Sequence, residues 1–581
     1  MKKWLILFFL APSLLYAQPN FFDTFTFTRA DSLRGKITEQ RDYDVFFYDL
    51  SVAFNIEEQS ITGENQIHFT VPAKRNRIQV DLFENLAIES IKLFGKTELP
   101  FKREGNVIFI DYETFKPKKK YWITVAYSGS PIIAKKPPWD GGFIWTNDTM
   151  TGKPWVAVAC EGLGASSWWP CKDHLSDEPD SMHLHYTVPK DLVAVANGKQ
   201  AGETNPDQLH KTYHWHIHYP INSYNVTFYI GDYVSMEYPE KFYYPSGGYF
   251  SENPDFEPPS FWVINSRDSI NKWKFDYHYG NQVLMELEVI LCPYPFELDG
   301  YKLVEAPYWG MEHQSAIAYG NNQKLNEFWF DFITLHESGH EWFGNLISCG
   351  DHADLWIHEA FTTYLEAMFL EHDEEKYSTS CAQPIPFLDR MPRDEYFKQK
   401  AIQYLNTQRA KIKNQMPIKG PYNVNFNAWP DADMYYKGTW MLHTLRTLVE
   451  NDSLWFETIR GMTKEFAFKP VYTKDVVEYL SRELDKDLTD FFNQYLNYAS
   501  LPKIEYYFTK SGDQSVLHYR YAGELEAFDA PVRYFFNDEL VEYQWLFPTR
   551  EWKTQELTIG NSKDFNWDVD HFLIDFEKVK R

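Results

Sequence analysis

The sequence is poor in cysteine, and after its N-terminus it lacks any long apolar run. Five cysteines in 581 residues are too few for a disulfide scaffold, and their odd number leaves at least one thiol without a partner in the same chain. Their spacing excludes a zinc ribbon and leaves a bond between Cys160 and Cys171 open. No segment beyond the N-terminus is apolar enough to span a bilayer, so we expect no transmembrane segment.

Basic residues are also scarce relative to acidic ones. The chain has 57 Lys and Arg against 82 Asp and Glu, a formal net charge of -25. A surface this acidic repels nucleic acid and anionic membranes and favours cationic ligands, so we expect no nucleic-acid partner. A hydrophobic content of 44% argues against disorder. The length is too great for one core and predicts several domains.

The first residues are typical of a secretory signal peptide. Two lysines precede an apolar core at residues 4–10, and Ala17 offers a cleavage site before Gln18. No cysteine follows to carry a lipid, and an uncleaved anchor is the alternative. We therefore expect residues 1–17 to be removed on export, and the mature protein to be periplasmic or extracellular.

The period of the apolar pattern divides the rest of the chain. After an N-terminal segment at 18–41, apolar and polar residues alternate with a period of two over 42–240, which predicts a β domain. Over 241–500 the period shifts towards that of helices. Over 501–581 it returns to two, enough for a small C-terminal β-sandwich. The sequence thus predicts a multidomain α+β protein.

Within the central region the boundary and three helices are marked most clearly. A stretch rich in Pro, Gly and Ser at 240–258 predicts the boundary with the β domain. Apolar residues at helical spacing then predict helices at 261–280, 327–347 and 355–372.

One strand of the β domain carries an unusual row of histidines. His214, His216 and His218 alternate with apolar residues and therefore share one face of the strand. A solvated sheet face is the simpler interpretation, and a metal site is the alternative.

The segment "TLHESGHEWFGN" at 334–345 carries the strongest chemical signal. His336 and His340 are four residues apart, so on a helix both imidazoles lie on one face and can bind one ion. Glu337 is near enough to reach a water on that ion. In zinc hydrolases this pattern supplies two metal ligands and a general base.

A third ligand candidate lies on the next predicted helix. A catalytic zinc needs three protein ligands and one open position. Glu359 lies among core-like residues in "DLWIHEAFTTYLE", and a hairpin of two helices would bring its carboxylate to the ion. Glu366 lies two turns further along the same face, where it either supports the site from behind or forms an ordinary helix ion pair.

At this point the chain resembles the gluzincin aminopeptidases, the group of aminopeptidase N and the leukotriene-hydrolase-type enzymes. Beyond the metal motif, "PYWGMEHQS" at 307–315 is similar to the family's Gly-x-Met-Glu-Asn segment. "MYYKGTWMLHTLR" at 434–446 resembles its Tyr-x-Lys-Gly helix, and "ACEGLGASSWWPCKD" at 159–173 resembles the loop that closes the site. The motifs follow the family's order over about residues 42–508.

The resemblance implies a fold and a set of roles. The β domain would be a saddle of sheets and the catalytic domain a thermolysin-like α/β fold. One zinc ion per chain would be bound by His336, His340 and Glu359. Glu337 would be the general base, and Tyr435 would donate its hydroxyl to the tetrahedral intermediate. Glu312 and, from the β domain, Glu161 would bind the substrate's free amino group.

The sequence departs from the family pattern at four positions. Trp309 and His313 stand where the Gly-x-Met-Glu-Asn segment begins and ends, and His358 and Ala360 flank Glu359 in place of Asn and Gly. The large helical C-terminal domain of the longer relatives has no counterpart here.

These parts predict a zinc-dependent aminopeptidase that releases single residues from peptides with a free N-terminus. An endopeptidase, or a hydrolase of a non-peptide electrophile on the same site, is one alternative. An inactive secreted binding scaffold is another. The oligomeric state stays open.

Overall fold

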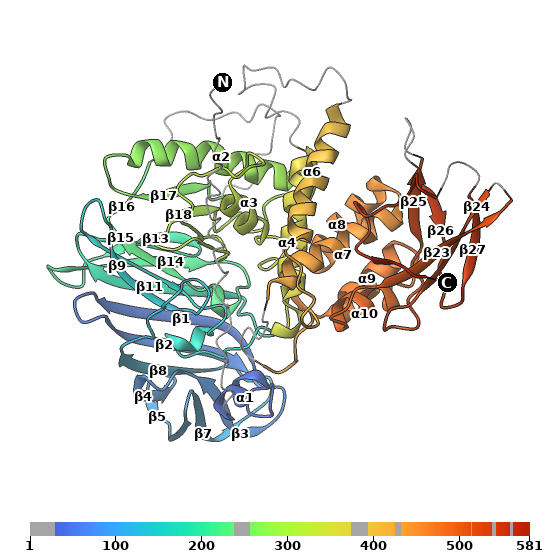
Figure 1. The fold of residues 1–581 in the computed structure, drawn as a ribbon. Helices are drawn as coiled ribbons and strands as arrows, with labels where there is room; N and C mark the ends of the chain where they lie inside the picture. The colour runs from blue at the N-terminus through green and yellow to red at the C-terminus, as the bar shows by residue number, and fades with distance from the viewer. Residues whose placement is uncertain are drawn as a thin grey trace, which may run out of the picture.

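The computed structural model describes residues 29–236, 256–372, 393–424, 431–512, 514–536, 542–557 and 562–580. The predicted signal peptide, Cys381 and most of the predicted boundary segment lie outside these ranges. From blue to red, Figure 1 shows sheets, then a mainly helical part, then a second group of strands. The prediction of a multidomain α+β protein is confirmed.

The N-terminal part is built on an eight-stranded sheet. Its centre is β1 (Asp44–Asn55), antiparallel to β2 (Ser60–Thr70) and parallel to β11 (Ser181–Pro189). Outside β11 lie β14 (His210–Ile217) and β13 (Lys199–Thr204); outside β2 lie β8 (Tyr121–Gly129), β4 (Leu86–Leu93) and β5 (Thr97–Glu98). Alternate residues of β1 and β11 are buried, as the period of two requires.

Two smaller sheets complete this part. One has three strands, β3 (Arg75–Asp81), β7 (Val107–Phe115) and β6 (Phe101–Glu104). The other has four, β12 (Val193–Ala196), β15 (Phe228–Gly231), β10 (Pro154–Ala159) and β9 (Gly142–Asn147).

The segment before β1 is tied to these sheets by buried ion pairs. Helix α1 (Arg29–Gly35) places Arg34 Nη2 2.9 Å from Asp173 Oδ2, and Arg41 Nη2 lies 2.7 Å from Asp81 Oδ2. Residues 29–41 therefore pack as part of the β domain.

The central part contains a five-stranded sheet of mixed direction. Its order is β16 (Tyr233–Ser235), β17 (Ser260–Ile264), β18 (Lys302–Glu305), β20 (Ile317–Tyr319) and β19 (Gly310–Met311). The prediction of a helix over 261–280 is wrong in its first part, because residues 260–264 form β17, which pairs in parallel with β18. The helix α2 begins only at Ser269 and runs to Ile290.

The described residues after α2 form seven further α-helices, of which α3 carries the metal motif. They are α3 (Phe332–Gly339), α4 (Trp356–His372), α6 (Arg393–Arg409), α7 (Asp433–Val449), α8 (Asp452–Glu465), α9 (Thr473–Glu483) and α10 (Thr489–Asn497). The predicted helix over 327–347 is shorter than expected, because it ends at Gly339 and is followed by turns and the short strand β21 (Ile347–Cys349), paired with β22 (Lys469–Val471). None of the described helices is long and apolar enough to cross a bilayer.

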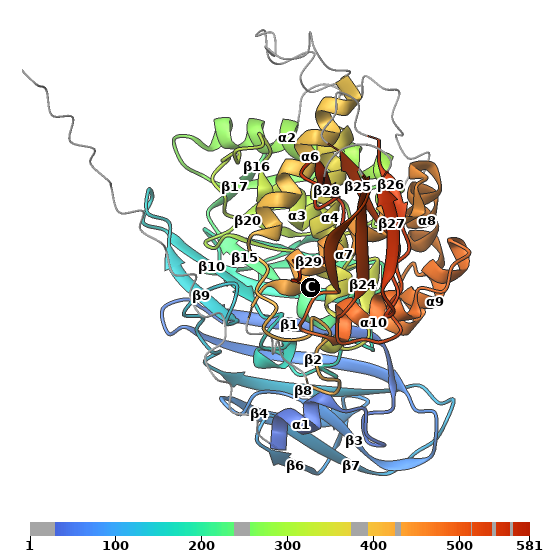
Figure 2. The ribbon, with the colours of Figure 1, turned by 45° about the vertical axis from the view of Figure 1, so that its right-hand side comes forward.

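The C-terminal part consists of two small sheets. One has the order β27 (Lys553–Leu557), β24 (Gln514–Tyr521), β23 (Lys503–Ser511) and β29 (Asp575–Lys578); the other has β26 (Gln544–Leu546), β25 (Val532–Phe536) and β28 (Phe565–Trp567). They lie beside α7 and α10 (Figure 2), and Tyr495 of α10 donates to the carbonyl of Leu573 at 2.9 Å.

The β domain and the central part share an extensive polar interface. Tyr308 donates to the carbonyl of Val158 at 3.0 Å, and Asn197 donates to the carbonyl of Gln314 at 2.7 Å. The four described cysteines are free thiols, so Cys160 and Cys171 are not bonded to each other.

Candidate metal centre and active site

Two imidazoles converge at the end of α3. Asp331 caps the helix by accepting from the N–H of Thr334 at 3.1 Å, and His340 closes its C-terminus. His336 Nε2 and His340 Nε2 are 3.2 Å apart. The spacing of four residues therefore has the consequence that the sequence predicted, even though the helix ends between the two histidines.

The other nitrogen of each ring is fixed by a hydrogen-bond acceptor. His336 Nδ1 lies 2.7 Å from Glu366 Oε1, and His340 Nδ1 lies 2.8 Å from the carbonyl of Phe343. These acceptors place a proton on each Nδ1 and leave both Nε2 lone pairs facing one another. Lone pairs in that arrangement need a cation between them.

Glu359 completes the set from the first turn of α4. Its Oε2 lies 3.6 Å from His336 Nε2 and 3.5 Å from His340 Nε2, is buried, and accepts no hydrogen bond. Three ligands about 2.0–2.1 Å from a tetrahedral zinc ion are about 3.3 Å apart, so the set fits Zn²⁺. Burial raises the pKa of Glu359, but the two histidines outweigh it and hold the pKa well below its usual value.

The structure decides the role of Glu366, which the sequence left open. The side chain is fully buried, and besides holding His336 it accepts hydrogen bonds from Tyr404 and, at 3.3 Å, from Gln408. Glu366 therefore orients a metal ligand from behind, and Tyr404 and Gln408 of α6 are supporting residues that no motif identified.

Glu337 lies next to the ligands and is almost fully buried. Burial raises its pKa to about 8, with Glu312 adding to the rise and His336 opposing it. A divalent cation held by the three ligands would act in the same direction as His336. A Cβ atom on Gly310 would lie 2.5 Å from Glu337 Oε1, so glycine at 310 is what leaves room for this carboxylate. No motif singled out Gly310.

Tyr435, on α7, also lies beside the histidine pair. Its ring stacks on His336 at 6.2 Å between centroids, whereas the neighbouring Tyr436 contacts Lys411. Burial and the charge of Glu359 raise the pKa of Tyr435 well above its usual value, so its hydroxyl stays protonated. A Cβ on Gly438 would lie 2.5 Å from Ala360, so this glycine allows α7 to approach α4 closely.

Glu312 and Glu161 reach the same space from two domains. Glu312 Oε1 accepts from Tyr224 of the β domain at 3.0 Å, and Asn345 Nδ2 donates to the Glu312 carbonyl at 2.9 Å. Glu161 follows β10, and its Oε1 is buried without a hydrogen-bond partner. Burial and then the charge of Glu312 raise the pKa of Glu161 well above its usual value, so each carboxylate lies within the electrostatic influence of the other. Tyr224 and Asn345 are positioning residues that the motifs did not single out.

The residues that depart from the family pattern have visible partners. Trp309 is 45% exposed and stacks on Phe332, whose ring in turn stacks on His336. His313 Nδ1 lies 2.8 Å from the hydroxyl of Tyr229, so its ring points to the β domain. His358 Nε2 accepts from the N–H of Cys349 at 2.8 Å and anchors the start of α4.

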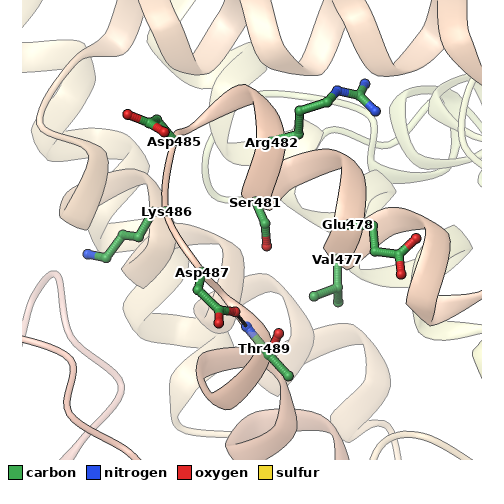
Figure 3. Close-up of a pocket in the computed structure, with 8 residues that line it drawn as sticks. All are labelled: Val477, Glu478, Ser481, Arg482, Asp485, Lys486, Asp487 and Thr489. Atoms are coloured by element: carbon green, nitrogen blue, oxygen red, sulfur yellow. Dashed lines mark hydrogen bonds between the residues drawn. The ribbon is translucent and has the colours of Figure 1, made fainter.

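A separate hollow lies on the surface at α9 and α10 (Figure 3). It is lined by Val477, Glu478, Ser481, Arg482, Asp485, Lys486, Asp487 and Thr489. None of these residues belongs to the metal cluster or to the carboxylate group beside it, so the hollow has no part in the site.

Comparison with known proteins agrees with this geometry. Residues 46–225 match the peptidase M1 N-terminal domain, and residues 277–495 match the peptidase family M1 domain. Leukotriene A-4 hydrolase of Xenopus laevis is 23% identical over 58% of this chain and 51% of its own length. Glutamyl aminopeptidase of Sus scrofa is 19% identical over 78% of this chain and 47% of its own length. The chain thus spans about half the length of these relatives.

The fold matches a solved structure over most of its length. An M1 zinc metallopeptidase mutant from Deinococcus radiodurans, bound to a Tyr-Ser-Ala substrate, superposes with a TM-score of 0.61 at 19% identity, over 80% of this chain and 96% of that one. Two family domains in their usual order, on a fold that carries the three-ligand cluster, lead to one conclusion: the chain belongs to the M1 peptidase family.

Proposed function

We propose that this protein is a zinc-dependent aminopeptidase that removes single residues from the N-terminus of peptides. The observation that carries the proposal is that ligand atoms of Glu312, Glu337 and His340 lie within 4.8 Å of one another, next to the cluster of His336, His340 and Glu359. Glu161 adds a buried carboxylate oxygen without a hydrogen-bond partner. Like charges without water repel strongly and need cations. A divalent ion at the histidine pair and a substrate ammonium group beside Glu161 and Glu312 supply the missing positive charge.

Each residue then has a task in peptide hydrolysis. When bound, Zn²⁺ supplies a Lewis acid and lowers the pKa of water towards neutrality. Glu337 accepts the proton of the attacking water and delivers it to the leaving amine. The Tyr435 hydroxyl donates a hydrogen bond to the former carbonyl oxygen as negative charge develops on it. Glu366 and the Phe343 carbonyl keep the two imidazoles in the required tautomer.

Glu161 and Glu312 determine which peptide bond of the substrate is hydrolysed. Glu312 is held by Tyr224 and by Asn345, so its position beside the metal is fixed before substrate arrives. An α-ammonium group bound there leaves room for one residue between the amine and the metal, which selects exopeptidase action. Further support comes from similar proteins. One relative is named a glutamyl aminopeptidase, and one solved structure is bound to a tripeptide substrate.

Glu312→Gln is expected to lower kcat/KM for an amino-acid amide by about one to three powers of ten. A carboxylate close to an ammonium group contributes on the order of 1–4 kcal/mol at surface-like dielectric, and the neutral amide loses that attraction. Glu327→Gln, which removes one exposed charge upstream of α3, is the matched control and should leave the rate unchanged.

Hydrolysis of the N-acetylated amide by the wild type separates the alternatives. We expect it to be barely cleaved. If the blocked form is preferred, or if Glu312→Gln has no effect on the free amine, the protein is an endopeptidase or acts on another electrophile. No hydrolysis of any peptide by the zinc-loaded protein would favour a binding scaffold.

Tyr435→Phe is expected to lower kcat by about 10²–10³-fold with little change in KM, because one donor to the developing oxyanion is lost. Tyr436→Phe is the matched control, since that ring contacts Lys411 rather than His336. Steady-state kinetics of both variants on one amide substrate give the answer. A near-normal kcat in Tyr435→Phe would assign the residue a packing role only.

We also propose that the protein is exported and acts in the periplasm or outside the cell. The proposal rests on the signal-like residues 1–17 and on the absence of a cysteine in position to carry a lipid. N-terminal sequencing of the protein from a periplasmic extract should find Gln18 first. A chain that begins at Met1 in that fraction would contradict cleavage.

A further inference from the structure

The solvent side of the large β-sheet carries a cluster of histidines that the reaction does not use. Parallel pairing of β1 with β11 sets Asp49 opposite His183. Antiparallel pairing of β11 with β14 sets His183 opposite His216, and His185 opposite His214. The sequence showed only the row on β14; the sheet adds two histidines and a carboxylate from neighbouring strands.

Three of these side chains bring ligand atoms together. One atom each of Asp49, His183 and His185 lies within 4.8 Å of the other two, and His185 Nε2 is 3.1 Å from Asp49 Oδ1. The side chains of Asp49 and His185 are 29% and 23% exposed, so an ion can reach them from solvent. From this geometry we propose that Asp49, His183 and His185 form a second metal site, for a divalent first-row transition cation such as Zn²⁺.

The His185 ring is held from behind by a hydrogen bond, as the rings of metal-binding histidines commonly are. His185 Nδ1 lies 2.6 Å from His214 Nδ1, and His214 Nε2 lies 2.9 Å from Thr204 Oγ1. This chain of hydrogen-bonded groups can pass protons from one ring nitrogen to the next without losing one. When His185 Nε2 binds an ion, its Nδ1–H donates to His214, whose Nε2–H donates to Thr204.

The protonation states suit a cation. The ring of His183 stacks on His216 with 3.9 Å between centroids. Burial and then His216 lower the pKa of His183, so at neutral pH its imidazole is neutral and keeps a lone pair. Burial raises the pKa of Asp49, but the hydrogen bond from His185 outweighs it and keeps the carboxylate charged. Two imidazoles and a carboxylate are donors that zinc and its neighbours in the first row accept.

Three ligands converge among the residues that the structure describes, which leaves the remaining coordination positions to water. None of these residues belongs to the catalytic cluster, and the net charge of -25 draws cations to the surface in general. The proposed site is therefore independent of the proposed peptidase activity and can be tested without substrate.

The test is a titration of Co²⁺ into the untagged protein already loaded with one zinc per chain. We expect one further ion to bind saturably and to give a visible absorption band, and Zn²⁺ to displace it. His185→Ala should abolish this second binding. His214→Ala, which removes only the support behind His185, should weaken it by about 10–100-fold.

His210→Gln is the matched control, because His210 lies on β14 like His214 but outside the cluster, and pairs with Asp207. This variant should bind the second ion like the wild type, and hydrolysis of an amino-acid amide should be unchanged in His185→Ala. Absence of saturable binding by the wild type, or unchanged binding in His185→Ala, would overturn the proposal. The two binding measurements that decide the proposal are spectroscopic and stand even if the protein hydrolyses no peptide.

Discussion

Glu337→Gln is expected to leave the zinc in place and to lower kcat by about 10²–10⁴-fold. An amide has the shape of the carboxylate but cannot accept the proton of the attacking water. The change leaves His336, His340 and Glu359 in place, so the ion should stay bound. The measurement pairs zinc content per chain with kcat on an amino-acid amide.

A second variant tests the position of the same carboxylate without removing it. In Gly310→Ala the new Cβ would lie 2.5 Å from Glu337 Oε1 and 2.7 Å from Ile333 Cγ2, so the base must move. We expect kcat to fall while zinc content stays at the wild-type level. Full activity in Glu337→Gln would remove the general base from the proposal, and Glu327→Gln controls for the loss of a charge.

His340→Ala is expected to abolish both zinc binding and activity. Wild-type protein should retain about one zinc per chain through dialysis, because three ligands hold the ion. Without His340, a single imidazole and Glu359 remain, and the buried carboxylates around them lose the cation that offsets their repulsion. Metal analysis after dialysis, with and without added zinc, measures the loss.

Glu366→Gln should have a smaller effect on zinc binding than His340→Ala. Within the metal cluster Glu366 contacts only the rear nitrogen of His336, so its replacement should weaken zinc affinity by about 10–100-fold while activity returns at saturating zinc. Full zinc occupancy in His340→Ala would mean that the metal lies elsewhere, and no change in Glu366→Gln would limit that residue to packing.

The local sequence pattern was sufficient to predict the parts of the site that lie within a few residues of one another. His336 and His340 share a face because a spacing of four residues is close to one helical turn of 3.6 residues. The period of two likewise identified the N-terminal and C-terminal strands. The helical period failed at Ser260–Ile264, where a short apolar run fits a strand and a helix equally, and pairing with β18 decides for the strand.

What the sequence determined by itself is therefore the donor set and the order of the motifs. Only the tertiary structure decided that the charge of Glu312 acts on Glu161 of the other domain, that Glu366 holds His336, and that Gly310 makes room for Glu337. The tertiary structure alone likewise brought together the β-sheet cluster of Asp49, His183 and His185. Each of these contacts joins residues far apart in the chain, and their distance is set by strand register and domain packing, which no local period encodes.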